Sequence, residues 1–430
     1  MRYEPLDPAL FSGNRERFGS LMKPGSVAIF NANDEYPRSG DQFYPFRQHS
    51  DFFYLTGINQ EKSVLLLAPD HPDPKLREIL FLVETNEEMA IRDGSKLTKV
   101  EATAISGIKN VQWLNGFEMT MRDLVIWSDH VFLNTYEYPK YSSEVFSRDH
   151  RFAWELQRQY PSHCYERSAP LMTRLRMIKT EKEIDLIRQA LTITEKAFRR
   201  MLKYTKPGVY EFEIQAEMEH EFLINRSTGS AFAPIIASGK NACVLHYTEN
   251  DKSCENGELV LFDFGAEYAN YAADISRTIP VNGKFNPRQR QLYELVLKVQ
   301  KLSVQQMFPG NTMEKYNTFV NNEMEKEMIR IGLLDKDEVE KQDPDQPLFK
   351  KYFMHGTAHH LGLDVHDVIH KYEPFKAGMV FTCEPGIYIR EEGIGIRLEN
   401  NILITENGPV DLSFNIPAEP DEIEALMAQR

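Results

Sequence analysis

Short apolar runs separated by polar segments characterise the first third of the chain. They predict strands over residues 26–31, 52–56, 63–68, 78–83 and 131–134. Continuous apolar runs of this length are typical of strands that are covered on both faces and alternate with helices. We therefore expect a mixed α/β domain here, which ends near Ser168, Ala169 and Pro170.

The pattern becomes helical after this boundary. Thr180 and Glu183 have the spacing of a capping box, and apolar residues then recur at helical spacing as far as residue 202. Pro207–Gly208 ends this helix, and a second amphipathic helix follows around Met218. Strands come next, so this segment predicts the order helix, helix, strands.

The same order of elements occurs a second time, about 100 residues further on. Pro287 opens a helix, Pro309–Gly310 ends it, a helix follows over residues 314–330, and strands come next. We interpret the repeat as an internal duplication, although chance recurrence of common elements would look the same. A duplicated, pseudo-twofold fold would place the strands of both halves around one centre.

The first half contains a predicted hairpin with two aspartates. Its strands span residues 259–268 and 271–279, with the turn at Ala269 and Asn270. If the hairpin closes there, we expect Asp263 to lie opposite Asp274. Opposed residues on an antiparallel pair project from one face, about 5 Å apart.

The second half repeats this arrangement with two glutamates. Its strands span residues 379–390 and 395–404, with a bulge near Pro385. The turn lies midway between Glu384 and Glu399, so these two residues face each other as well.

Four carboxylates at mirrored positions need a partner of opposite charge. A single acid in a strand is usually a solvated edge residue, but paired acids on a mostly apolar sheet would cost several kcal/mol if unpaired. The segment between the hairpins, residues 354–367, contains four of the twelve histidines. A carboxylate-rich set with little histidine suits two divalent ions, whose charge the four carboxylates would balance.

Composition and charge exclude several other classes of protein. The chain has 430 residues, 42% hydrophobic and 27% charged, which is enough for two or three domains. Its net charge of −14 argues against nucleic acid or a membrane as partner. We find neither an apolar signal segment nor a run of about 18 apolar residues. Four cysteines are too few for a disulfide framework, so we expect a reducing, cytoplasmic location.

Several motifs are similar to those of a known family. They are LHYTEN (245–250), LFDFG (261–265), ADISRT (273–278), HGTAHHLGLDVHD (355–367), EPGIY (384–388) and GIRLEN (395–400), with YPFRQHSDFFYLTG (44–57) near the N-terminus. Together they cover nearly the whole chain. In this combination and order the chain resembles the Xaa-Pro aminopeptidase (aminopeptidase P) family of pita-bread peptidases.

The resemblance implies a fold, a metal centre and an assembly. We expect an α/β (α+β) protein with a creatinase-like N-terminal domain over residues 1–170 and a pseudo-twofold pita-bread catalytic domain over residues 171–430. Members of this family form dimers or tetramers, so a homodimer or homotetramer is implied. Asp41 matches an N-terminal acid that approaches a site in such assemblies.

The metal ligands follow by motif. Asp263 would bind one of two divalent ions, typically Mn²⁺, His359 and Glu384 would bind the other, and Asp274 and Glu399 would bridge them. These ions would lower the pKa of a shared water towards 7, and the resulting hydroxide would attack the Xaa-Pro carbonyl carbon. Glu384 would carry the proton to the leaving nitrogen. Because that nitrogen belongs to proline and lacks N–H, we expect a close-fitting apolar or aromatic pocket.

Five further residues are candidates for contacts at the site. His246, His355 and His366 would contact substrate or the transition state, or else are buried imidazoles with satisfied hydrogen bonds. Arg397 lies two residues before Glu399 and therefore on the same strand face; it orients carboxylates or forms a structural ion pair. Tyr388 lies near the metals or belongs to the aromatic core.

The sequence departs from the family pattern in two places. His360 follows the expected ligand His359 where an aromatic residue is common, and we expect it to point away from the metals. The segment 86–96 lacks the tryptophan that this branch often places beside the site, which bears on substrate preference.

The predicted activity is the release of the N-terminal residue from peptides with proline at the second position. An Xaa-Pro dipeptidase shares the same ligands and is the alternative enzyme. A non-catalytic pita-bread binding module is the alternative from another class, but such modules have lost ligands that are all present here.

Overall fold

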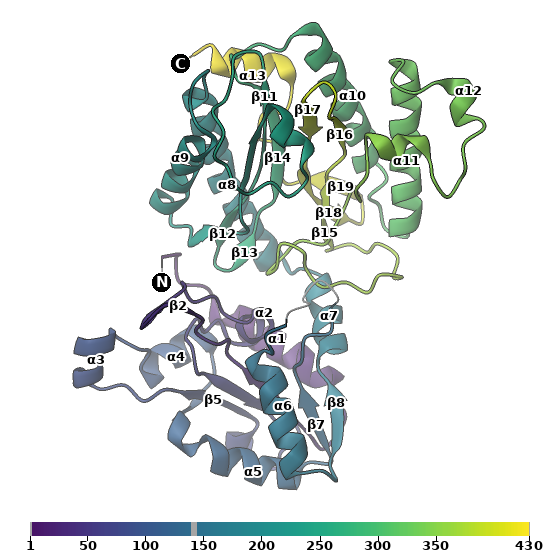
Figure 1. Ribbon diagram of the computed structural model, residues 1–430. Coiled ribbons are helices and arrows are strands. Elements are labelled where there is room, and N and C mark those ends of the chain that lie inside the picture. Colours follow the sequence, from purple (N-terminus) through teal and green to yellow (C-terminus); the bar gives the residue numbers. More distant parts are fainter. Residues whose placement is uncertain (1, 139–143, 430) are drawn as a thin grey trace. The chain divides into compact units, whose positions relative to one another are not determined.

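The chain forms two compact units, Tyr3–Arg176 and Met177–Arg430. They are seen in a computed structural model that describes residues 2–138 and 144–429. Figure 1 traces the elements of each unit. We describe each unit by itself.

The first unit is built on a six-stranded mixed sheet in the order β6-β5-β4-β1-β7-β8. β1 (Ser26–Asn31) is antiparallel to β4 (Val64–Leu67) and parallel to β7 (His130–Leu133). The other strands of the sheet are β5 (Glu78–Leu82), β6 (Asn110–Trp113) and β8 (Cys164–Arg167), and a separate exposed hairpin consists of β2 (Pro37–Ser39) and β3 (Gln42–Phe43). The predicted mixed α/β character of this region is thereby confirmed.

Helices cover both faces of this sheet. The helices are α1 (Pro8–Leu21), α2 (Ser50–Thr56), α3 (Glu87–Asp93), α4 (Lys99–Ser106), α5 (Phe117–Trp127), α6 (Arg148–Gln159) and α7 (Ala169–Met177). Val27, Ile29 and Val131 face one side and pack against Leu124 of α5 and Leu156 of α6. On the other side the Phe18 ring of α1 lies 5.2 Å from the Phe30 ring. Apolar side chains on both faces explain why the strands read as continuous apolar runs.

One strand prediction in this unit is wrong. Residues 52–56 form the end of helix α2, which begins after the N-cap His49 and ends at Gly57 in the left-handed conformation, φ 68°. Every residue of α2 is buried. A short helix that is buried all round shows no amphipathic period, so a run of apolar residues cannot distinguish it from a buried strand.

The second unit contains two halves with the same order of elements. In the first half, α8 (Glu181–Tyr204) and α9 (Glu211–Ile224) precede β9 (Gly229–Ser230), β10 (Ile235–Ser238), β11 (Leu259–Phe264), β12 (Ala266–Tyr268), β13 (Tyr271–Ala272) and β14 (Ile275–Pro280). In the second half, α10 (Pro287–Val304), α11 (Met313–Arg330) and α12 (Lys336–Val339) precede β15 (Val380–Cys383), β16 (Gly386–Ile389), β17 (Ile394–Arg397), β18 (Asn400–Thr405) and β19 (Gly408–Asp411), and α13 (Pro420–Met427) follows. The capping box predicted at Thr180 and Glu183 is confirmed.

The helices of each half pack on the strands of the same half. α8 contacts β12 and β13, and α10 contacts β15, β16 and β17 (Figure 1). The strands of the two halves meet where β14 lies beside β17 and β18. We call this line of contact, with Asp274 at one end of β14 and Glu399 between β17 and β18, the seam.

The register of the first hairpin corrects our prediction. Asp263 pairs with Ser276, and Asp274 lies two residues away from the predicted position opposite Asp263. The turn is where we expected it, because Ala269 and Asn270 have φ angles of 49° and 65°, as in a type I′ turn. A two-residue turn there pairs residue 268 with residue 271 and so fixes the observed register. Since a strand repeats every two residues, the shift leaves both aspartates on one face.

The second hairpin has the predicted register. Cys383 pairs with Asn400 and Gly386 pairs with Arg397. Glu384 and Glu399 therefore face each other in the short gap between the β15–β18 pair and the β16–β17 pair.

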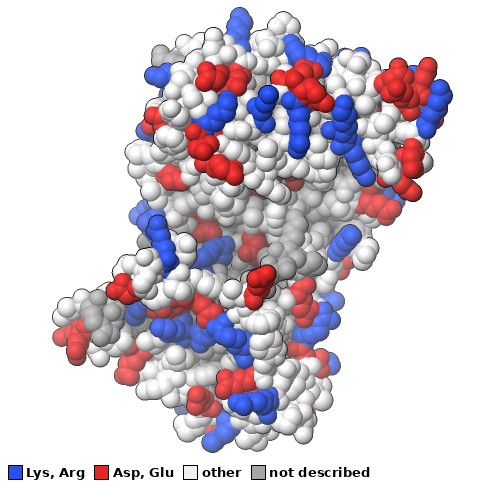
Figure 2. Space-filling model, in the orientation of Figure 1, with Lys and Arg blue, Asp and Glu red and all other residues white. Residues whose placement is uncertain are grey.

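On the face drawn in Figure 2, acidic and basic side chains are interspersed. Among the described residues, no helix combines the length and apolar character needed to cross a bilayer.

Gly265 allows the first hairpin to pass close to Asp274. A Cβ at this position would lie 1.7 Å from the carbonyl oxygen of Ala273. We predict that Gly265→Ala lowers the free energy of unfolding by roughly 3 kcal/mol, because backbone would have to move. Gly13→Ala in α1, where a Cβ meets nothing within 4 Å, is the control and should stabilise slightly. Thermal melting of both variants measures the difference, and equal melting temperatures would contradict the prediction.

Candidate metal centre

Backbone contacts across the seam bring acids from both halves together. The Glu399 amide donates to Ser276 O at 3.0 Å, and the Asp274 amide donates to Asn401 Oδ1 at 3.2 Å. Asp274 and Glu399 are 4% and 2% exposed. One main-chain hydrogen bond and one hydrogen bond to the buried Asn401 side chain thus hold them in place.

Three of the predicted ligands converge closely. Asp274, His359 and Glu399 each offer one donor atom, and these atoms all lie within 4.8 Å of one another. His359 Nε2 lies 3.3 Å from Asp274 Oδ2 and 3.9 Å from Glu384 Oε1. His359, from the segment between the two hairpins, therefore lies at the seam.

Asp263 completes the group of five. Its Oδ2 accepts a hydrogen bond from Arg397 Nη2 at 2.5 Å. Its Oδ1 is buried and has no hydrogen-bond partner among the described residues. Such an atom is costly unless a ligand satisfies it.

The carboxylates of the group repel one another. The pKa of Glu384 is raised to about 7, chiefly by burial and also by the negative charges of Asp274 and Asp263, while His359 and Arg397 act to lower it. Burial also raises the pKa of Glu399, again with a contribution from Asp274. Carboxylates crowded in this way are stabilised in their charged form by cations.

The residues present fit divalent metal ions. The donors are four carboxylates and one imidazole, which suit a hard or borderline divalent cation. The buried Oδ1 of Asp263 and the close approach of the other donors give such ions places to bind.

Arg397 connects the acids to one another. Its guanidinium donates to Asp263, to Tyr388 Oη at 3.0 Å and to Ser276 Oγ at 2.8 Å. Ser276 Oγ in turn donates to Glu399 Oε2 at 2.7 Å. Arg397 thus forms an ion pair with Asp263 and orients Glu399 through the Ser276 hydroxyl. Both predicted roles, an ion pair and the orientation of carboxylates, therefore describe part of its contacts.

Ser276 is a site residue that our sequence reasoning missed. It lies two residues after Asp274 on the same strand and is fully buried. The alternation of strand side chains, which places it on the face of Asp274, was the signal that could have identified it.

Tyr388 and His355 extend this network. Tyr388 is 1% exposed, and its hydroxyl lies 2.8 Å from His355 Nε2. His355 Nδ1 lies 2.7 Å from the carbonyl of Gly356, which only accepts, so Nδ1 carries the proton and Nε2 accepts from Tyr388. Burial lowers the pKa of His355 to about 4, with smaller contributions from Arg397 and His246.

The remaining predicted residues are more exposed. His366 places its ring 4.3 Å from that of His359, edge to face, and is exposed. His246 is also exposed, and its electrostatic effect on His355 places it nearby. Asp41 lies exposed in the β2–β3 turn of the first unit, and its role stays a prediction.

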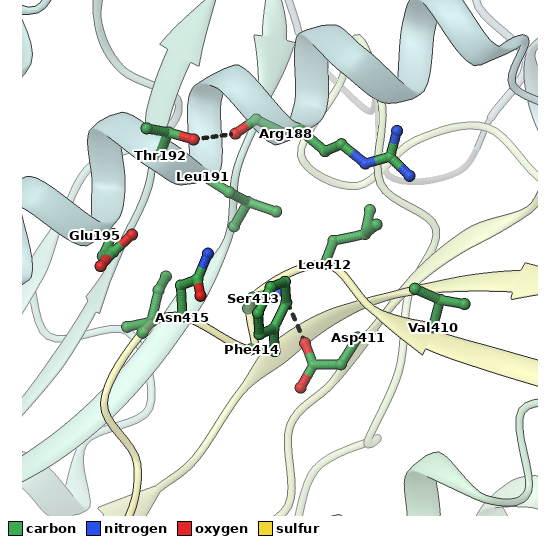
Figure 3. A pocket seen from close by; sticks show the side chains of 11 residues that line it. Arg188, Leu191, Thr192, Glu195, Val410, Asp411, Leu412, Ser413, Phe414 and Asn415 are labelled. Carbon is green, nitrogen blue, oxygen red and sulfur yellow. Dashed lines mark hydrogen bonds between the residues drawn. The ribbon is translucent and has the colours of Figure 1, made fainter. Parts of the chain in front are cut away.

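A separate pocket in the second unit contains none of these residues. It has a volume of about 270 Å³ and lies between α8 and residues 410–416 (Figure 3). The Ser413 amide donates to Asp411 Oδ1 at 2.8 Å in its wall. The metal centre is therefore distinct from this pocket.

Comparisons with known proteins agree with this geometry. The family model for metallopeptidase family M24 matches residues 185–406, and the model for the aminopeptidase P N-terminal domain matches residues 11–132. The chain belongs to metallopeptidase family M24. Its catalytic unit therefore belongs to a family of metal-dependent peptidases.

Full-length relatives support the M24 assignment. The chain is 34% identical to Xaa-Pro aminopeptidase of Haemophilus influenzae, covering 97% of this chain and 96% of the relative, and 35% identical to that of Escherichia coli, with 97% of both covered. Among solved structures, aminopeptidase PepP of Pseudomonas aeruginosa has a TM-score of 0.89 at 30% identity, covering 99% of this chain and 98% of that one. Zn-substituted E. coli aminopeptidase P in complex with product has a TM-score of 0.88 at 33% identity, with 99% of both covered. The predicted fold class is confirmed.

The contacts of Ser276 generate a prediction about metal affinity. We expect Ser276→Ala to weaken binding of a divalent ion about 10- to 100-fold, because Glu399 and Arg397 lose the hydroxyl that joins them. Calorimetric titration of the metal-free protein with Mn²⁺ measures the change. Ser303→Ala, which removes an equally buried hydroxyl from α10, is the matched control and should leave affinity unchanged.

Proposed function

We propose that this protein is a metal-dependent aminopeptidase that releases the N-terminal residue from peptides with proline at the second position. The observation that carries the proposal is the convergence of acids from both halves and His359 at one seam. The match to an aminopeptidase P N-terminal domain, as well as to family M24, favours this branch of the family.

The proposed metal ligands are Asp263, Asp274, His359, Glu384 and Glu399. Bound divalent ions would supply Lewis-acid stabilisation of the scissile carbonyl and a lowered pKa for water. Mn²⁺ is our proposed metal, since carboxylate and imidazole donors suit it.

Glu384 is the proposed proton carrier. Its side chain is 19% exposed, compared with 16% for Asp263 and 6% for Asp274, so among these acids it is the most open to a substrate. Its Oε2 lies 3.9 Å from His355 Nδ1. From this position it can take a proton from water and deliver it to the proline nitrogen, which has no N–H of its own.

The histidines are proposed to hold the substrate. His246 and His366 are exposed, and the His366 ring lies 4.3 Å from that of His359. His355 already uses both ring nitrogens within the protein, so a contact with substrate would require it to exchange one of these hydrogen bonds.

Assembly and location are also proposals. The exposed β2–β3 hairpin contains Phe43 and is flanked by Tyr36 and Tyr44; these side chains are 52%, 43% and 57% exposed, respectively, and such surfaces favour a second copy of the chain as partner. The four free cysteines suit a reducing, cytoplasmic location.

Peptide length and sequence test the proposed activity. We predict release of arginine from Arg-Pro-Pro in the presence of Mn²⁺, and at least about 10-fold slower release from Arg-Ala-Pro, whose first peptide bond is a secondary amide. Chromatographic detection of free arginine measures both rates. Rapid cleavage of the dipeptide Arg-Pro without action on the tripeptide would replace the proposal with an Xaa-Pro dipeptidase.

Loss of a bridging acid tests the metal centre. We predict that Asp274→Ala abolishes activity and the retention of divalent metal after dialysis, because the group loses a donor at its centre. Elemental analysis of the purified proteins measures metal content. Asp185→Ala, which removes an exposed acid paired with Arg188, is the control. Unchanged metal content in Asp274→Ala would refute its assignment as a ligand.

A further inference from the structure

Lys179 is a buried lysine beside the metal centre that the reaction itself does not use. It lies directly before Thr180, the N-cap of α8, and its side chain is 1% exposed. Its amide donates to Gly378 O at 2.8 Å. The backbone of Lys179 is therefore held by Gly378 on one side and by the start of α8 on the other.

The Lys179 ammonium lies inside the turn that connects His359 to His366. Its Nζ lies 3.0 Å from Asp367 Oδ2 and 3.2 Å from His360 Nδ1. These two residues follow directly after His366 and His359, respectively. An ammonium only donates, so it holds Nδ1 of His360 as an acceptor.

The turn closes tightly around this group. A Cβ on Gly362 would lie 2.2 Å from Asp367 Oδ2 and 3.0 Å from Lys179 Cε. The amide of Asp367 donates to His360 O at 2.9 Å. The space around the ammonium thus leaves no room for a side chain at residue 362.

The same turn sets the orientation of His359. The carbonyl of His360 lies 3.0 Å from His359 Nδ1 and accepts its proton, which leaves Nε2 facing Asp274. The His360 ring packs edge to face on Phe381 at 4.5 Å and takes no part in the group of donors. The atom that orients His359 therefore belongs to a residue that Lys179 holds.

We propose that Lys179 is a positioning residue that fixes His359 and His366 for metal and substrate binding, acting through His360 and Asp367. The inference rests on the proposed function, in which His359 is a metal ligand. It gives His360, the position at which this chain departs from an aromatic residue, a defined role as the acceptor for Lys179.

Energetics favour a geometric role over a purely stabilising one. Moving an ammonium and a carboxylate out of water is costly, and well-packed apolar residues often stabilise a core as well as a buried ion pair does. The side chains of Lys179 and Asp367 are 1% and 2% exposed. Hydrogen bonds from the ammonium are directional, and here they lie beside His359 and His366, whose rings they can orient.

Lys179→Met tests this role. The change keeps the length and volume of the side chain and removes the ammonium. We expect affinity for Mn²⁺ to fall about 10- to 100-fold. At saturating Mn²⁺ we also expect kcat for Arg-Pro-Pro to fall and KM to rise, because His359 and His366 lose their fixed orientations. Calorimetric titration of the metal-free protein and steady-state kinetics at saturating Mn²⁺ measure these quantities.

Lys298→Met is the matched control. Lys298 Nζ lies 2.7 Å from Glu327 Oε1, and the Glu327 side chain is 1% exposed, so this variant also removes a lysine from a buried carboxylate. We expect it to lower the melting temperature without changing metal affinity or kcat. If Lys179→Met resembles this control, losing only thermal stability, Lys179 is structural and the inference is wrong.

Asp367→Asn decides the question if Lys179→Met does not fold. It keeps an oxygen acceptor for Lys179 and removes only the charge, and we expect a roughly three- to tenfold loss of Mn²⁺ affinity. Metal affinity equal to that of the parent protein would overturn the inference. Failure of the parent protein to bind Mn²⁺ or cleave Arg-Pro-Pro would instead refute the proposed function on which the inference rests.

Discussion

Negative charge concentrated in a buried seam is the constraint on which the catalytic unit depends. Asp274 and Glu399 come from different halves of the unit and are nearly inaccessible to water, with Glu384 and Asp263 beside them. Such a group is unfavourable by itself, because burial and mutual repulsion both oppose ionisation. Arg397 offsets part of this charge from within the protein, and divalent ions are suited to balance the rest.

The surrounding structure holds these acids at the seam. The main-chain hydrogen bond from Glu399 to Ser276 and the hydrogen bond from the Asp274 amide to the Asn401 side chain link the two halves. The buried Arg277 guanidinium adds hydrogen bonds to the carbonyls of Ser276, Glu399, Ile416 and Pro417, and so ties the C-terminal segment to the same point. The rigidity of the seam is what permits several donors to be positioned for divalent metal.

The two sides of the centre both rest on paired strands and differ in their side-chain contacts. The acids depend on paired strands and on the links from Arg397 through Ser276 and Tyr388. His359 lies in a segment that pairs with β15, where the Thr382 amide donates to His359 O at 2.9 Å and the Leu361 amide donates to Val380 O at 3.0 Å. The buried Lys179 ammonium adds side-chain contacts to His360 and Asp367. Outer contacts of this kind orient metal ligands and tune their affinity. The N-terminus of α8 thus contributes to a site that is formed by residues much later in the chain.

The sequence by itself determined the local features: most of the strands, the turn at Ala269 and Asn270, the capping box at Thr180 and the facing positions of Glu384 and Glu399. These depend on neighbouring residues, and the family motifs pointed to the candidate ligands because they lie within such short segments. Only the tertiary structure decided that residues 52–56 are helical, since a fully buried helix has no polar face to reveal its period. It alone brought Ser276 to Glu399, 123 residues apart, and Lys179 to Asp367, 188 residues apart. Contacts over such separations arise from the packing of one half against the other, and no local pattern of residues encodes them.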